Sequence, residues 1–160
     1  MSNNKLINDY NEFKQKRPLG ITGGPIDINK FDEWEITIPG PVNSPYEGGK
    51  FKVKISFPSD FPNSPPTCIF DTKVFHPNIN FQTGYICVNF LKKGTEDEKK
   101  ENKKTWTNKL TVCKIVVGLY GLLKSPNQTD PLNHNAHSLY VRDPPRYFKL
   151  AKNFTNKFAK

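Results

Sequence analysis

Residues 21–70 read ITGGPIDINKFDEWEITIPGPVNSPYEGGKFKVKISFPSDFPNSPPTCIF. Within them, short runs rich in β-branched and aromatic residues alternate, or nearly alternate, between apolar and polar side chains. They cover Ile21–Ile28, Phe31–Ile38, Phe51–Phe57 and Thr67–Phe70. A period of two is typical of strands that pack on one face and meet water on the other. Glycine and proline clusters separate the runs and indicate turns. We therefore expect an antiparallel meander of four strands.

Helical periodicity precedes this meander. Leu6, Tyr10 and Phe13 recur at spacings of four and three, which predicts an amphipathic helix over residues 3–16. Pro18 is expected to end it, because proline lacks the N–H that a helix interior requires.

Helices are expected again after Trp106. Thr111 can cap a helix, and its apolar stripe consists of Val112, Ile115, Val116, Leu119, Leu122 and Leu123. A short helix is predicted over His134–Tyr140, and Asp143, followed by two prolines, is expected to open the last one. The order predicts an α+β fold with an N-terminal helix, a four-stranded antiparallel meander, a long loop and C-terminal helices.

Length and charge restrict the possible functions. The chain of 160 residues is expected to form a single domain over residues 1–160. Its formal charge of +9 favours acidic partners, but its lysines are scattered and no arginine-rich cluster with aromatics occurs, so nucleic-acid binding is not expected as the main function. No apolar stretch could span a bilayer and the N-terminus lacks a signal-peptide region, so we expect a cytoplasmic or nuclear protein that is not bound to membranes.

Residues 71–110 show little periodicity, and an irregular stretch of this length in a compact domain is usually functional or disordered. Its first half holds His76, Asn78 and Cys87. Its second half, residues 92–105, is dominated by charged side chains and is expected to form a mobile surface loop with nothing to bury.

Cys87 is the candidate nucleophile among three cysteines. Cys68 falls in a predicted strand and Cys113 in a predicted helix, where free cysteine commonly serves as a small packing residue. Their spacing indicates neither a disulfide framework nor a metal site. His76 is a possible base for Cys87, but it is also a candidate for bracing its own turn. No local protease motif and no Cys-x-x-Cys redox motif occurs.

Several motifs carry a resemblance to a known family. The central ones are His76-Pro77-Asn78, Ile86-Cys87 and Trp106. Around these lie further matching segments at residues 44–49, 57–62, 64–66 and 125–132. Together they cover nearly the whole chain, and they resemble the ubiquitin-conjugating enzyme family.

The resemblance implies a chemistry. Cys87 would accept ubiquitin from an activating enzyme as a thioester and transfer it, usually with a ligase, to lysines of protein substrates. Asn78 would steady the oxyanion, brace its loop, or do both, and His76 would brace the turn. Asp130 would position the incoming lysine, with a simple turn residue as the alternative. No cofactor is implied, because the upstream activating enzyme consumes the ATP.

The resemblance also implies partner surfaces. The activating enzyme would dock on the basic side of the first helix, at Lys5, Lys14, Lys16 and Arg17, although the charge pattern by itself favours a solvated helix face. Ligases would meet Asn63, Thr107, Asn108 and Lys109, which depart from the residues usual in the family at these positions.

Other modifiers remain as alternatives. Asn80 stands where enzymes for the SUMO modifier usually have an aromatic residue, so SUMO ranks second, and NEDD8 ranks third because that subfamily's extended N-terminal tail is missing. A non-catalytic ubiquitin-binding variant of the fold would lack the cysteine. The loop from Asn78 to Cys87 is one residue longer than usual, and the segment from Cys87 to Trp106 is longer by about a dozen.

Overall fold

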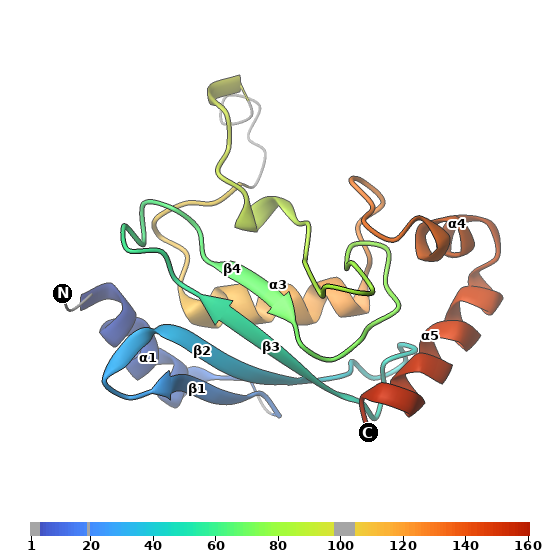
Figure 1. Ribbon diagram of the computed structural model, residues 1–160, viewed down its shortest axis with the longest axis horizontal. Coiled ribbons are helices and arrows are strands. Elements are labelled where there is room, and N and C mark those ends of the chain that lie inside the picture. Colours follow the sequence, from blue (N-terminus) through green and yellow to red (C-terminus); the bar gives the residue numbers. More distant parts are fainter. Residues whose placement is uncertain (1–3, 19, 98–104) are drawn as a thin grey trace.

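The computed structural model describes residues 4–18, 20–97 and 105–160. Its elements follow the chain in the predicted α+β order (Figure 1): α1 (Asn4–Lys16), β1 (Thr22–Asp27), β2 (Lys30–Pro39), β3 (Lys50–Ser56), β4 (Thr67–Phe70), the 3₁₀ helix η1 (Asn89–Leu91), α3 (Val112–Lys124), α4 (His134–Arg142) and α5 (Pro144–Phe158). The predicted fold class is confirmed. The 3₁₀ helix after Cys87 was not predicted, because a three-residue element leaves no periodic pattern.

The sheet is the predicted antiparallel meander, with strand order β1-β2-β3-β4. Along β2, Trp34, Ile36 and Ile38 are fully buried, whereas the residues between them are partly exposed. Strand β3 alternates strictly, and its lysines at positions 50, 52 and 54 all face solvent. The alternation therefore assigns one face of the sheet to the core and the other to water.

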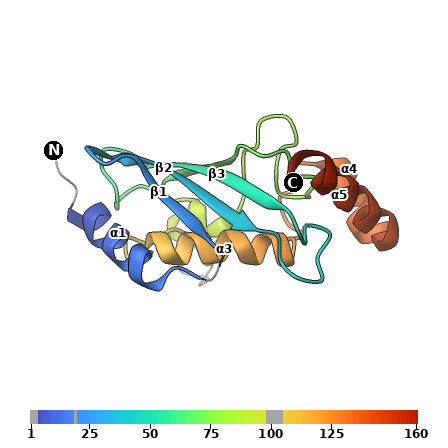
Figure 2. The ribbon, with the colours of Figure 1, turned by 90° about the horizontal axis from the view of Figure 1, so that it is seen from below.

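Helices α1 and α3 lie together against one face of the sheet (Figure 2). Trp34 of β2 fills the space under α1, with edge-to-face ring contacts to Tyr10, Phe13 and Phe57. Such aromatic contacts add to the free energy gained by burial alone. The apolar stripe predicted for residues 112–123 faces this core, and Thr111 caps α3 by accepting a hydrogen bond from the Lys114 N–H.

Helices α4 and α5 lie at the end of the molecule opposite the N-terminus (Figure 1). Asn133 caps α4 and Asp143 caps α5, as its sequence predicted, whereas α4 runs two residues further than expected. The Tyr46 hydroxyl donates to the Phe75 carbonyl at 2.7 Å and in turn accepts from the Tyr147 hydroxyl. This buried pair ties α5 to the start of the long loop that carries the candidate site.

The charged segment differs in part from its prediction. Residues 98–104 lie outside the described residues, but its two ends are packed. Thr105 is buried, a Cβ at Gly94 would lie 2.4 Å from its hydroxyl, and the Trp106 N–H donates to the Lys92 carbonyl at 2.8 Å. The expectation that residues 92–105 have nothing to bury is therefore wrong for Thr105.

Within residues 4–18, 20–97 and 105–160, no helix is long and apolar enough to cross a membrane. The same ranges contain no group of three or more histidine, cysteine, aspartate or glutamate side chains arranged to hold a metal ion.

Candidate active site

His76 is sealed in the core, with 0% of its surface exposed. Its Nδ1 accepts the Asn78 N–H at 3.0 Å, so Nε2 carries the proton and donates to the Leu122 carbonyl at 2.8 Å. Both ring nitrogens are thus occupied by backbone partners, and neither is available to take a proton from Cys87. The contacts favour the turn-bracing interpretation of His76 over that of a general base.

Burial lowers the pKa of His76 to about 4. In the unfolded chain His76 becomes protonated as the pH falls through about 6.5, whereas in the folded chain it becomes protonated only near pH 4. The free energy of unfolding therefore falls as the pH drops through this window. The shift predicts a loss of about 3 kcal/mol between pH 7 and pH 4. Urea unfolding at a series of pH values should show this slope in the wild type and a much shallower one in His76→Asn. Equal slopes would contradict the prediction.

A tight turn returns the chain from Asn78 to Cys87. The Asn80 side-chain oxygen accepts the N–H groups of Gln82 and Thr83, both at 2.9 Å. Gly84 has φ +78°, and a Cβ there would lie 1.9 Å from the Phe70 carbonyl, so only glycine fits.

Cys87 consequently lies beside the His76–Asn78 turn. Its N–H donates to the Asn78 carbonyl at 3.1 Å, and the neighbouring Ile86 pairs with Ile79. Cys87 is half-buried, so the residue is not enclosed in the core. Next to it, Pro66, Tyr85, Ile86 and Leu91 are among the residues that line a surface pocket of about 180 Å³.

The other two cysteines are held as thiols. Burial raises the pKa of Cys68 to about 12. Burial, followed by the nearby Glu12 carboxylate, raises the pKa of Cys113 to about 11. Since the thiolate is the nucleophilic form, neither is suited to attack at neutral pH, in agreement with their predicted packing roles.

Asn78 is also fully buried, and both ends of its amide are engaged. The nitrogen donates to the carbonyls of Asn127 and Thr129 at 2.9 and 3.3 Å, and the oxygen accepts the Asn127 N–H at 2.9 Å. Both amide hydrogens are thus directed at the segment that leads to Asp130, so an oxyanion could be bound only by releasing one of these bonds. The geometry favours loop bracing.

The His76–Asn78 turn also binds residues 127–133 at a second point. The Pro77 carbonyl accepts the N–H groups of Leu132 and Asn133 at 2.8 and 3.0 Å. Asp130 lies between the two anchors with φ +50°, a left-handed conformation that aspartate tolerates better than most residues. The structure therefore brings Asp130 to the Cys87 loop, although 43 positions separate the two in sequence.

Lys92 joins this group and was missed by the sequence analysis. Its ammonium donates to the Asp130 carboxylate at 3.3 Å, and a hydrogen bond with Cys87 raises the pKa of Lys92. The backbone N–H of Lys92 closes η1 by donating to the Asn89 carbonyl at 2.9 Å, which fixes the start of the side chain. Lys92 belongs to a lysine-rich run, and nothing in the sequence distinguishes it from Lys93.

Comparison with known proteins identifies the family. The model of the ubiquitin-conjugating enzyme family matches residues 5–155. The chain belongs to the ubiquitin-conjugating enzyme family. Among solved structures, it is similar to the E2 domain of a ubiquitin-conjugating enzyme from Toxoplasma gondii, with 31% identity, 98% of each chain covered and a TM-score of 0.81. The family consists of transferases that work with ubiquitin, activating enzymes and ligases in general, and it includes inactive variants.

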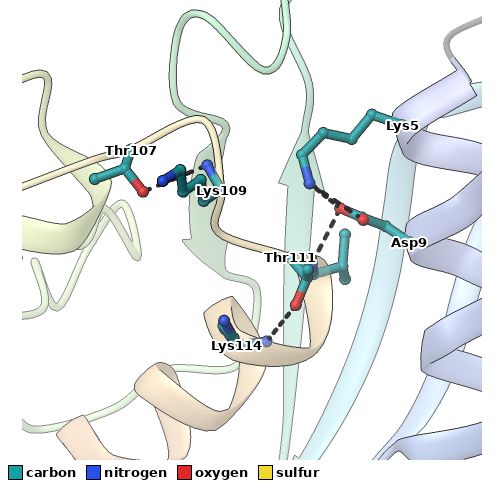
Figure 3. Close-up of polar contacts among 7 residues, drawn as sticks. Lys5, Asp9, Thr107, Lys109, Thr111 and Lys114 are labelled. Carbon is teal, nitrogen blue, oxygen red and sulfur yellow. Dashed lines mark hydrogen bonds and ion pairs between the residues drawn. The ribbon is translucent and has the colours of Figure 1, made fainter.

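On this ubiquitin-conjugating fold, the predicted docking residues of α1 divide into two groups. Lys14, Lys16 and Arg17 are exposed. Lys5 instead pairs with the buried Asp9 at 3.2 Å, and Asp9 also accepts the Val112 N–H at the start of α3 (Figure 3). Lys5 therefore supports the contact between α1 and α3, a role that the sequence did not predict.

The predicted ligase residues lie close together on the ubiquitin-conjugating fold. The Trp106 indole N–H donates to the Pro62 carbonyl at 2.9 Å, which places Asn63 beside the segment that carries Thr107, Asn108 and Lys109. All four side chains are exposed, and the Thr107 hydroxyl accepts the Lys109 N–H (Figure 3). The Lys5 ammonium lies 5.9 Å from the ring of Phe61, so the start of α1 lies beside the turn that carries Asn63.

Proposed function

We propose that the chain is an active ubiquitin-conjugating enzyme that carries ubiquitin on Cys87 and transfers it to lysine amines. The observation that carries the proposal is the position of Cys87. It is a half-buried cysteine on an irregular loop with a lysine ammonium and a carboxylate close by, whereas the other two cysteines are held as thiols. A non-catalytic variant of the fold would have no need for this cysteine.

The reaction takes two acyl transfers. In the first, the Cys87 thiolate attacks the thioester carbonyl of ubiquitin on the activating enzyme, and that enzyme's sulfur leaves as a thiolate. In the second, an uncharged lysine amine attacks the new thioester, the Cys87 sulfur leaves as a thiolate, and the nitrogen loses a proton to give an isopeptide bond. ATP is used only upstream, so the chain itself requires no cofactor.

Asp130 serves the second transfer. A lysine amine has a pKa of about 10.4 in water, so it arrives as an ammonium that must lose its proton before it attacks. A carboxylate at the entrance attracts and orients this ammonium, although its charge also favours the protonated form. Asp130 speeds transfer when the gain from orienting the amine exceeds the cost of stabilising its protonated form. Asn78 and His76 contribute by holding the surrounding loops.

Ubiquitin is the modifier that we propose, in line with the family to which the chain belongs. SUMO and then NEDD8 are the alternatives. The proposed activating-enzyme surface lies at the basic C-terminal end of α1, at the exposed Lys14 and Lys16 and at Arg17 just after the helix. The proposed ligase surface is the exposed group of Asn63 with residues 107–109.

A charging assay tests the proposal. The purified chain is incubated with activating enzyme, ATP and ubiquitin, with SUMO and NEDD8 and their activating enzymes in parallel. We expect a mass gain of one ubiquitin that a thiol reductant removes, because a thiol cleaves a thioester by exchange. A gain with SUMO or NEDD8 alone would assign a different modifier, and no gain with any of them would contradict the enzyme assignment.

A further inference from the structure

Lys92 occupies the place that an acceptor lysine requires. Its ammonium lies 3.3 Å from the Asp130 carboxylate, and a hydrogen bond with Cys87 is the first cause of its raised pKa. An acceptor amine that attacks a thioester on Cys87 must approach the same sulfur, and by the proposed mechanism it contacts the same carboxylate. Lys92 and an acceptor lysine carry the same functional group, so the two cannot use Asp130 at the same time.

We infer that Lys92 is an internal competitor of the acceptor lysine, which sets how readily an acceptor amine enters the site. The inference rests on the proposed function, since it concerns the transfer step. In the charged enzyme the Cys87 sulfur is acylated and no longer attracts an ammonium as a thiolate would. The Asp130 carboxylate then remains as the partner of Lys92, and the acceptor amine must displace Lys92 from it.

Lys92 is suited to compete rather than to accept ubiquitin itself. In the charged enzyme the Asp130 carboxylate remains beside Lys92, and a nearby negative charge favours the protonated ammonium. An ammonium has no lone pair with which to attack a carbonyl. The side chain is also anchored at its base, because the Lys92 carbonyl accepts the Trp106 N–H and its own N–H closes η1.

The competition should be modest. The Lys92 side chain is 42% exposed and that of Asp130 63%, so water and salt screen the pair. Exposed ion pairs contribute little free energy. We therefore expect removal of the competitor to lower the half-saturating lysine concentration by about two- to fivefold. An effect of this size biases the choice among acceptors without blocking transfer.

The test measures discharge separately from charging. Enzyme is charged with ubiquitin, ATP is removed, and the loss of thioester is followed over a range of free lysine concentrations. Lys92→Gln is compared with Lys92→Arg, which keeps the cation, and with Lys93→Gln, which removes a charge from the exposed neighbouring residue. Asp130→Asn and the Lys92→Gln/Asp130→Asn double variant complete a cycle.

We expect Lys92→Gln to lower the half-saturating lysine concentration and to leave the rate at saturating lysine unchanged. Lys92→Arg and Lys93→Gln should match the wild type, and Lys92→Gln should have no further effect when Asp130 is already Asn. An unchanged half-saturating concentration, an equal change in Lys93→Gln, or ubiquitin attached to Lys92 in a reductant-resistant form would overturn the inference. A wild type that forms no thioester would overturn the proposed function and this inference with it.

Discussion

Replacement of Cys87 by alanine is expected to abolish the reductant-sensitive ubiquitin adduct, with a loss of more than about a thousandfold in the rate of charging. The proposed intermediate is a bond to this sulfur, and no other group at the site can replace it. Both nitrogens of His76 are bound to the backbone, and the other two cysteines remain thiols at neutral pH. The measurement is the mass of the chain after incubation with activating enzyme, ATP and ubiquitin.

Cys113→Ala is the matched control, because Cys113 is also half-buried but lies on α3, in the contact with α1. We expect it to charge at the wild-type rate. Circular dichroism should show that both variants are folded, since alanine adds no bulk at either position. An adduct that persists in Cys87→Ala, or one that disappears in Cys113→Ala, would show that the nucleophile has been misassigned.

Replacement of Asn78 by alanine is expected to leave charging near the wild-type rate and to slow discharge to free lysine by about a hundredfold. The change removes the side-chain bonds to Asn127 and Thr129. It thereby frees the segment that positions Asp130, and a displacement of about 1 Å is enough for a loss of this size. The partners lie near the surface, where water can replace the lost bonds, so the cost in stability should be only about 1–2 kcal/mol.

A second nucleophile separates bracing from oxyanion stabilisation. Hydroxylamine is uncharged at neutral pH and does not need Asp130, whereas the oxyanion forms whichever amine attacks. If Asn78 acts by bracing, discharge to lysine should fall much more than discharge to hydroxylamine. Equal losses would instead assign Asn78 to the oxyanion. Asn156→Ala, at an exposed position of α5, is the control and should match the wild type with both nucleophiles.

The elements of the fold were predictable because local patterns encode them. Strands β2 and β3 alternate with period two, and the caps at Thr111 and Asp143 mark the starts of α3 and α5. Errors were confined to a few termini, such as the end of α4, and to short features without periodicity, such as η1.

The candidate site was predicted only in part. The residues of the His76–Asn78 turn and Cys87 were identified by their resemblance to a family. The contacts that these residues make were not predicted. The Asn78 amide donates to the carbonyls of Asn127 and Thr129 because two loops that are distant in sequence pack against each other. The identity of these residues does not reveal that contact. Lys5 was predicted as a docking residue, yet its charge is directed at the buried Asp9. Charge read along a helix does not reveal a partner on a neighbouring element.

The sequence by itself determined the order of helices and strands, the buried faces of β2, β3 and α3, and the cysteine on an irregular loop, because these depend on neighbours within a few positions. The tertiary structure alone decided which distant groups meet at that cysteine. Lys92 reaches Asp130 because η1 turns the chain after Cys87 and the His76–Asn78 turn holds residues 127–133 beside it. Such contacts arise from the packing of loops that lie far apart in sequence, and their geometry leaves no periodic trace in the chain.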